Sequence, residues 1–150
     1  MRTQRYESGR SMIEIVGVLA IMGLITAAAF VLITSGMETR RRNQAADEVG
    51  NIVATYRGLF AEAGNFNNVG SVSLSALKLP TNNPWNHAYG VAGSGTSLTV
   101  YVGFDDTDTC SIMAARTWSD STLDNLCKES EDTCGKFTGA DVCISLTYGF

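Results

Sequence analysis

One long apolar run occupies the N-terminal part of the chain. Residues 15–33 contain no charge and no proline, and Thr26 is their only polar side chain. A helix needs roughly 20 apolar residues to cross the core of a bilayer, so this run is long enough to span one. We therefore assign residues 10–36 to a membrane-spanning helix.

Beyond Arg40-Arg41-Arg42 the pattern changes from apolar on all sides to apolar on one face. The apolar positions then recur at steps of three and four residues, at Val49, Ile52, Val53, Tyr56, Phe60 and Ala63. This spacing predicts that one helix runs from about Ser11 to Ala63, with its second half packed against a domain on one side. Gly64-Asn65 is a typical helix end.

The remaining residues favour a small antiparallel sheet. Tyr89–Ala92 and Ser97–Phe104 are predicted to form a hairpin, and the alternation from Val142 to Tyr148 predicts a last strand. In the hairpin, one alternating set should face the long helix: Leu98, Val100, Val102 and Phe104. The fold class is therefore α+β, with a long N-terminal helix packed on a small antiparallel sheet in a globular domain of residues 37–150.

Shorter elements are expected between these strands. Residues 65–86 are rich in Asn, Ser and Gly and predict a loop with one short helix near Ser75–Lys78. Two further helices are predicted over 109–118, capped by Asp108 or Thr109, and over 121–128.

All cysteines lie in the last 41 residues, at Cys110, Cys127, Cys134 and Cys143. An even number in a loop-rich region behind an apolar N-terminus predicts disulfides in an exported domain. Zinc is the alternative, but no CxxC pair is present and the only histidine, His87, is distant. Of the three possible pairings, we favour Cys110–Cys127 with Cys134–Cys143, because sequential pairs close short loops.

Charge and motifs argue against several functions. The formal net charge is −4, and nine acids but only three Lys or Arg residues follow Val100, so we expect no nucleic acid to bind the acidic head.

Asp105-Asp106-Thr107-Asp108 suggests calcium, but the EF-hand pattern fails at Cys110, which makes a helix cap the better interpretation. His87 is expected in a turn or at the surface. No catalytic or cofactor motif is present, which predicts a protein that is not an enzyme and holds no cofactor and no metal.

The N-terminus resembles the class III signal of type IV prepilins. The resemblance is carried by Gly9, by Glu14 as the fifth residue after it, and by the apolar run that follows. It departs from the family at Arg10, where Phe, Met or Leu is usual, and lacks the mid-helix proline of many type IVa pilins. Asn83-Pro84-Trp85 through Gly90 is similar to the turn that leads into the sheet of pilins and type II secretion pseudopilins.

The resemblance implies a processing and assembly pathway. A prepilin peptidase would remove the leader, residues 1–9, between Gly9 and Arg10 and methylate the new amino group of Arg10. The helix of residues 10–36 would then leave the inner membrane for the core of a homopolymer, an extracellular pilus built by pilus or secretion assembly machinery. Glu14 would pair with the amino group of Arg10 in a neighbouring subunit. The implied function is a structural subunit for adhesion, motility or DNA transfer.

Other interpretations stay open. Within the family, the chain could be a type II secretion pseudopilin or a minor pilin. Arg10 and Glu14 could instead form an ordinary helical ion pair. A secretory signal cut after Ala27-Ala28-Ala29 would release a disulfide-bonded binding domain, and an uncut run would anchor such a domain in the membrane.

Overall fold

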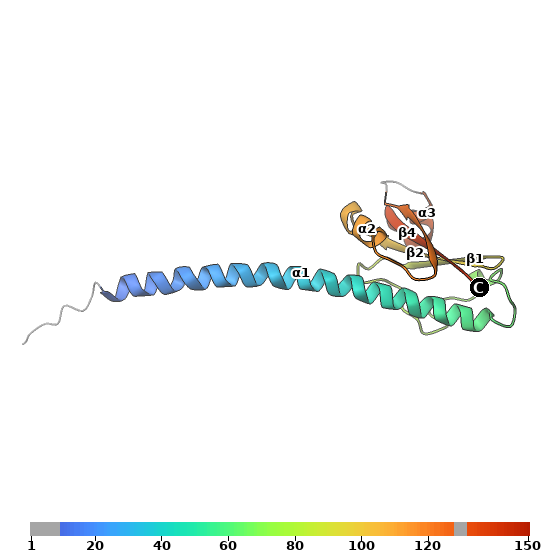
Figure 1. Cartoon of the computed structure of the whole chain (residues 1–150), viewed down its shortest axis with the longest axis horizontal. Coiled ribbons are helices and arrows are strands. Elements are labelled where there is room, and N and C mark those ends of the chain that lie inside the picture. The colour runs from blue at the N-terminus through green and yellow to red at the C-terminus, as the bar shows by residue number, and fades with distance from the viewer. Residues whose placement is uncertain (1–9, 128–131) are drawn as a thin grey trace, which may run out of the picture. The chain divides into compact units, whose positions relative to one another are not determined.

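The computed structural model describes the backbone of residues 10–127 and 132–150, with side chains from residue 12 onward. Along the chain, its elements are α1 (Arg10–Phe60), a 3-10 helix η1 (Val69–Ser71), β1 (Tyr89–Ser94), β2 (Ser97–Phe104), α2 (Thr107–Ala114), β3 (Ser121–Leu126), α3 (Asp132–Thr138) and β4 (Val142–Gly149) (Figure 1). The chain divides into two compact units, one up to Arg40 and one comprising Arg41–Phe150. Each unit is described by itself.

The second unit is an antiparallel sheet packed on the C-terminal part of α1, which confirms the α+β class. Its strand order is β1-β2-β4-β3, and every neighbouring pair is antiparallel. β4 lies in the middle, with Leu146 opposite both Val100 of β2 and Leu123 of β3. The predicted hairpin and last strand are therefore both present.

The core lies between this sheet and α1. The four hairpin residues expected to face the helix are at most 1% exposed, and they share one cluster with Ala45, Val49, Ile52, Val53 and Tyr56 of α1. These α1 residues are the apolar face that the three- and four-residue spacing predicts, because such positions recur on one side of a helix. Burial of this face holds the sheet on the C-terminal part of α1.

Helix α1 ends at Phe60, three residues earlier than the sequence predicts. The amide of Gly64 donates a 3.1 Å hydrogen bond to the carbonyl of Phe60, and Gly64 has φ +61°. A left-handed residue at this place ends a helix by satisfying one of its last carbonyls, and glycine adopts it without a steric penalty. The predicted glycine stop is thus present, and Ala61 to Ala63 belong to the turn.

The predicted helix over 121–128 is wrong. Residues Ser121–Leu126 form the edge strand β3, paired with β4 in register from Ser121–Tyr148 to Leu126–Cys143; Lys128 lies outside the described residues. The three-residue step from Leu123 to Leu126 resembles helical spacing. However, pairing with a buried strand and the bond from Cys127 to Cys110 outweigh so weak a local preference.

Three further elements differ from expectation. Residues 74–78 form turns rather than a helix, and the short helix of this loop lies earlier, at Val69–Ser71. Helix α2 begins two residues before the predicted start and ends at Ala114, because the cap is Asp106 and not Asp108 or Thr109. Helix α3 was not predicted, since its seven residues are too few to show a periodic pattern.

The Asn83-Pro84-Trp85 turn is built around a buried asparagine. The side-chain amide of Asn83 donates to the carbonyl of Gly103 at 2.6 Å, and its oxygen accepts the amides of Trp85 and His87, each at 3.0 Å. Burial of this amide side chain is tolerated because both its nitrogen and its oxygen are hydrogen-bonded. Asn83 thereby joins the turn to the end of β2.

Candidate functional site

The first unit is a helix whose apolar side chains are exposed on every side. From Met12 to Met37 the large hydrophobic residues are between 52% and 78% exposed. By length and composition, α1 can cross a membrane. A soluble helix normally buries one apolar stripe, whereas the large apolar residues of this one are exposed around its circumference within the described unit. Such a surface requires lipid or other helices around it.

The polar side chains of this run are satisfied within the helix. The hydroxyl of Thr26 donates to the carbonyl of Met22 at 2.7 Å, and Thr34 and Ser35 donate to Val31 and Leu32 at 3.0 and 3.1 Å. Hydroxyls that bond back to the preceding turn have no need of water. These hydroxyl groups are therefore compatible with a hydrocarbon environment.

Glu14 is the exception on this surface. It is the only charged residue between Met12 and Met37, it is exposed, and it borders a shallow hollow with Ile15, Val18 and Leu19. It makes no ion pair with any residue of 12–127 or 132–150. A carboxylate among apolar side chains is costly in a membrane unless it gains a partner.

The two processing residues are only partly covered. Gly9 lies outside the described residues, and Arg10 is the first residue of α1, described by its backbone alone. The helical ion pair between Arg10 and Glu14 therefore stays a hypothesis. The spacing of five residues between Gly9 and Glu14 is known from the sequence alone.

Both disulfides have the pairing that the sequence favours. Cys110–Cys127 has a Cα–Cα distance of 5.6 Å and joins α2 to the residue after β3, while Cys134–Cys143 has 5.5 Å and joins α3 to β4. Both distances are usual for a disulfide. Together they fasten the two short helices to the β3–β4 side of the sheet.

The acidic turn before α2 is a helix cap. Asp106 Oδ1 accepts the amide of Thr109 at 2.6 Å, and this bond is the largest of the effects that hold the pKa of Asp106 below its usual value. The neighbouring Asp105 lies 2.7 Å from Nε2 of His87, which is a half-buried turn residue. Within the part of the chain that the structure describes, no group of three His, Cys, Asp or Glu side chains could hold a metal ion.

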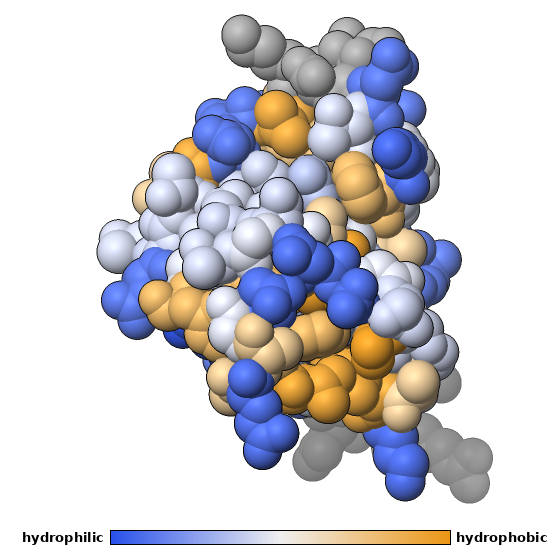
Figure 2. Space-filling model, turned by 90° about the vertical axis from the view of Figure 1, so that its right-hand side faces the viewer, coloured by the Kyte–Doolittle hydropathy of each residue, from blue (hydrophilic) through white to orange (hydrophobic). Residues whose placement is uncertain are grey.

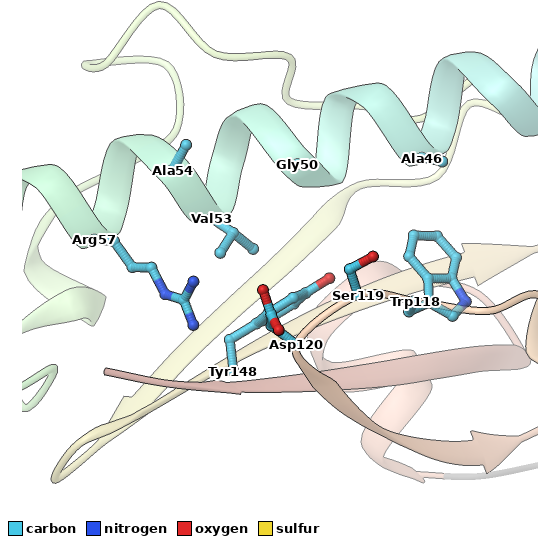
Figure 3. Close-up of a pocket in the computed structure, with 9 residues that line it drawn as sticks. All are labelled: Ala46, Gly50, Val53, Ala54, Arg57, Trp118, Ser119, Asp120 and Tyr148. Carbon is cyan, nitrogen blue, oxygen red and sulfur yellow. The ribbon is translucent and has the colours of Figure 1, made fainter.

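A groove that the sequence analysis missed lies in the second unit, between α1 and the turn before β3 (Figure 3). Its volume is about 300 Å³, and it is lined by Ala46, Gly50, Val53, Ala54 and Arg57 of α1 and by Trp118, Ser119, Asp120 and Tyr148. The sequence signal for this groove is the four-residue spacing of Ala46, Gly50 and Ala54. Small side chains on one face of a helix leave a depression there.

Arg57 closes one end of this groove. Its guanidinium donates to the carbonyl of Gly149 and lies 5.8 Å from the ring centre of Tyr148, while its Nε is buried and has no hydrogen-bond partner among the described residues. The charged side chains of the groove lining are Arg57 and Asp120.

The end of the second unit carries an exposed apolar area. Figure 2 shows hydrophobic residues gathered in the lower part of this face, with hydrophilic ones around them. Leu59 in the last turn of α1 and Phe150 after β4 are 50% and 53% exposed, and Phe150 stacks on the buried Phe66 at 4.3 Å. The hollow next to Phe150 is lined by Arg57, Asp120 and Gly149.

Comparison with models of protein families, with curated proteins and with solved structures finds no match to the chain. The resemblance to prepilins therefore rests on the residues named above.

Proposed function

We propose that the protein is a structural subunit of a type IV pilus or of a related filament. The observation that carries the proposal is a helix apolar on its entire surface, with Glu14 at its start five residues after Gly9 and a disulfide-bonded α+β unit at its other end. Each part has a role in such a filament. The glycine is the cleavage site, the helix is the polymerising element and the second unit is the exposed head.

The physical basis of assembly is the exchange of one apolar environment for another. Residues 12–37 would first lie in the lipid of the inner membrane and then in a bundle of the same helices from other subunits. Because both surroundings are apolar, the transfer does not require the helix surface to be exposed to water. The driving force must then come from packing and from specific polar contacts between helices.

Glu14 supplies such a contact in this scheme. Cleavage after Gly9 would create an amino group on Arg10, and Glu14 of one subunit would bind that group in its neighbour. A charge at the centre of an apolar helix costs about 2.5–3.5 kcal/mol on insertion scales, and less near the helix start, where Glu14 lies. A carboxylate that gains a cation there would set the register of the incoming helix.

Processing tests the proposal most directly. In cells that carry a prepilin peptidase, Gly9→Val should block cleavage, because the enzyme must approach the backbone at this residue and a branched side chain prevents it. Gly17→Val is the matched control: the same substitution falls where an added Cβ meets nothing within 4 Å, and cleavage should be normal. Intact mass and N-terminal sequencing of the membrane protein give the result.

The mature N-terminus separates the alternatives. Arg10 supports the prepilin assignment, Phe30 would identify a secreted binding domain, and Met1 an anchored one. A mature chain of normal mass in Gly9→Val would refute the proposal. Where the chain is cleaved after Gly9, the presence of surface filaments that contain the subunit would distinguish a pilin from a pseudopilin.

A further inference from the structure

Two arginines from distant parts of the chain lie at the beginning of the second unit. Arg41 is its first residue, on α1. Arg116, which follows α2, donates from Nη1 to Oδ1 of Asn43 at 3.0 Å, across 73 residues of sequence. The fold thus brings a guanidinium from outside the helix to the same turn, which the sequence alone does not reveal.

Both guanidinium groups retain donors for a ligand. Arg41 is exposed and makes no ion pair within the described residues. Arg116 is also exposed and uses one of its five N–H donors on Asn43. Guanidinium groups donate two parallel N–H bonds to phosphate oxygens, so each of these arginines can bind a phosphate group.

Arg41 and Asn43, the residue that Arg116 contacts, are on different sides of α1. Successive residues of a helix are about 100° apart, which separates positions 41 and 43 by about 200° around the axis. A protein partner that docks on one face would contact one of them. Lipid headgroups surround a membrane helix on all sides and can contact both.

The place of Arg41 in the chain matches the depth of a headgroup layer. Arg41 is four residues beyond Met37, the last large apolar residue of the run, which corresponds to about 6 Å of helix. Trp118 lies beside Arg116, with the guanidinium 5.9 Å from the ring centre. Tryptophan is enriched at membrane–water interfaces, where its apolar ring and its polar edge are both accommodated.

We propose that Arg41 and Arg116 bind the phosphate groups of anionic phospholipids at the membrane surface and hold the start of the second unit against the bilayer. This inference rests on the membrane stage of the proposed function but does not depend on processing or polymerisation. Nine acids and only three bases follow Val100, so an anionic membrane surface repels the acidic head. The contact of the two arginines with lipid opposes this repulsion. It would keep the waiting subunit in one orientation, and its loss would be part of extraction.

Lipid binding by the full-length chain tests the proposal. The protein in a neutral maltoside detergent is titrated with short-chain phosphatidylglycerol or phosphatidylcholine, and bound lipids are counted by native mass spectrometry. Phosphatidylglycerol should bind more tightly than phosphatidylcholine, and 1 M salt should weaken the binding of phosphatidylglycerol. Arg41→Gln with Arg116→Gln should weaken it roughly 25-fold, or about fivefold per arginine.

The control variant is Lys78→Gln with Lys136→Gln, which removes the same charge from exposed positions of the same unit and should bind as wild type. An excess of glycerol 3-phosphate should not displace the lipid. Equal binding of the two lipids, an equal loss in both double variants, or displacement by glycerol 3-phosphate would each overturn the proposal. Thermal unfolding checks that the arginine variants fold. Processing at Gly9 is measured separately, so either proposal can fail alone.

Discussion

The hydroxyl of Tyr89 donates a 2.7 Å hydrogen bond to Oε2 of Glu48, and this bond joins the first residue of β1 to helix α1. The other carboxylate oxygen of Glu48 accepts the side-chain amide of Gln44 at 2.8 Å. Tyr89 is 5% exposed, so its hydroxyl is taken from water and needs this partner. The sheet is therefore fastened to the helix by a polar contact as well as by the core.

We expect Tyr89→Phe to lower the free energy of unfolding by about 1.5–3 kcal/mol, because it removes a hydrogen bond to a charged group and leaves one carboxylate oxygen of Glu48 without its donor. Tyr101→Phe is the matched control, since the hydroxyl of Tyr101 has no hydrogen bond to any described residue and its ring stacks on Phe137. Urea unfolding of both variants measures the difference. Equal effects would show that the bond contributes nothing specific.

The same contact predicts a loss of stability in alkali. Burial, the hydrogen bond to Glu48 and the charge of Glu48, in that order, raise the pKa of Tyr89 far above its usual value of 10.0. Below pH 10 both the folded and the unfolded chain keep the proton, and the contribution is complete. Above pH 10 only the unfolded chain releases it, so stability falls as pH rises. The fall between pH 10 and 11 should be shallower in Tyr89→Phe than in wild type; an unchanged slope would contradict this assignment.

The elements that the sequence predicts well are those whose pattern is long. The alternation of Leu98, Val100, Val102 and Phe104 spans a whole strand, and the α1 stripe spans several turns, so burial on one side is visible in both. Strand β3 is an edge strand with exposed Thr122 and Asp124, and its conformation is decided by β4 and not by its own residues. Long-range pairs such as Arg116 with Asn43 leave no local signal at all.

Each disulfide should stabilise the second unit by about 3 kcal/mol, as estimated from the loss of chain entropy in loops of these lengths. The separations are 17 residues for Cys110–Cys127 and 9 for Cys134–Cys143, so the two contributions should be similar. Replacing both cysteines of one pair by serine, followed by thermal unfolding, measures each. Peptide mapping without reduction checks the pairing, and a peptide that links Cys127 to Cys134 would contradict it.

Gly93 and Gly50 should respond in opposite ways to the same substitution. A Cβ on Gly93 would lie 2.1 Å from the carbonyl oxygen of Phe66, whose amide is itself bonded to Gly95, so backbone must move. Gly93→Ala should cost about 1–3 kcal/mol or more. A Cβ on Gly50, within α1, meets nothing within 4 Å, and Gly50→Ala should be neutral or stabilising by up to about 1 kcal/mol. Urea unfolding compares them, and a destabilised Gly50→Ala would show that this face of α1 is not open.

Glu14 gives the sharpest test of assembly. If its carboxylate only forms a helix-surface pair with Arg10, Glu14→Ala should cost a few tenths of a kcal/mol and leave cleavage, insertion and filaments unchanged. If it binds the amino group of a neighbouring subunit, Glu14→Ala should still insert and be cleaved, because those steps use Gly9 and the apolar run. Filaments should then be sparse, since each incoming helix leaves an ammonium group unpaired among apolar side chains.

The measurement is the ratio of sheared surface filament to mature subunit that remains in the membrane. Glu62→Ala is the control, because it removes one exposed negative charge beyond the apolar run and should leave this ratio unchanged. Co-expression with wild type adds a second readout: mutant chains should enter mixed filaments poorly, since one end of each contact would lack its carboxylate. A wild-type ratio in Glu14→Ala would remove the assembly role and return Glu14 to an ordinary helical pair.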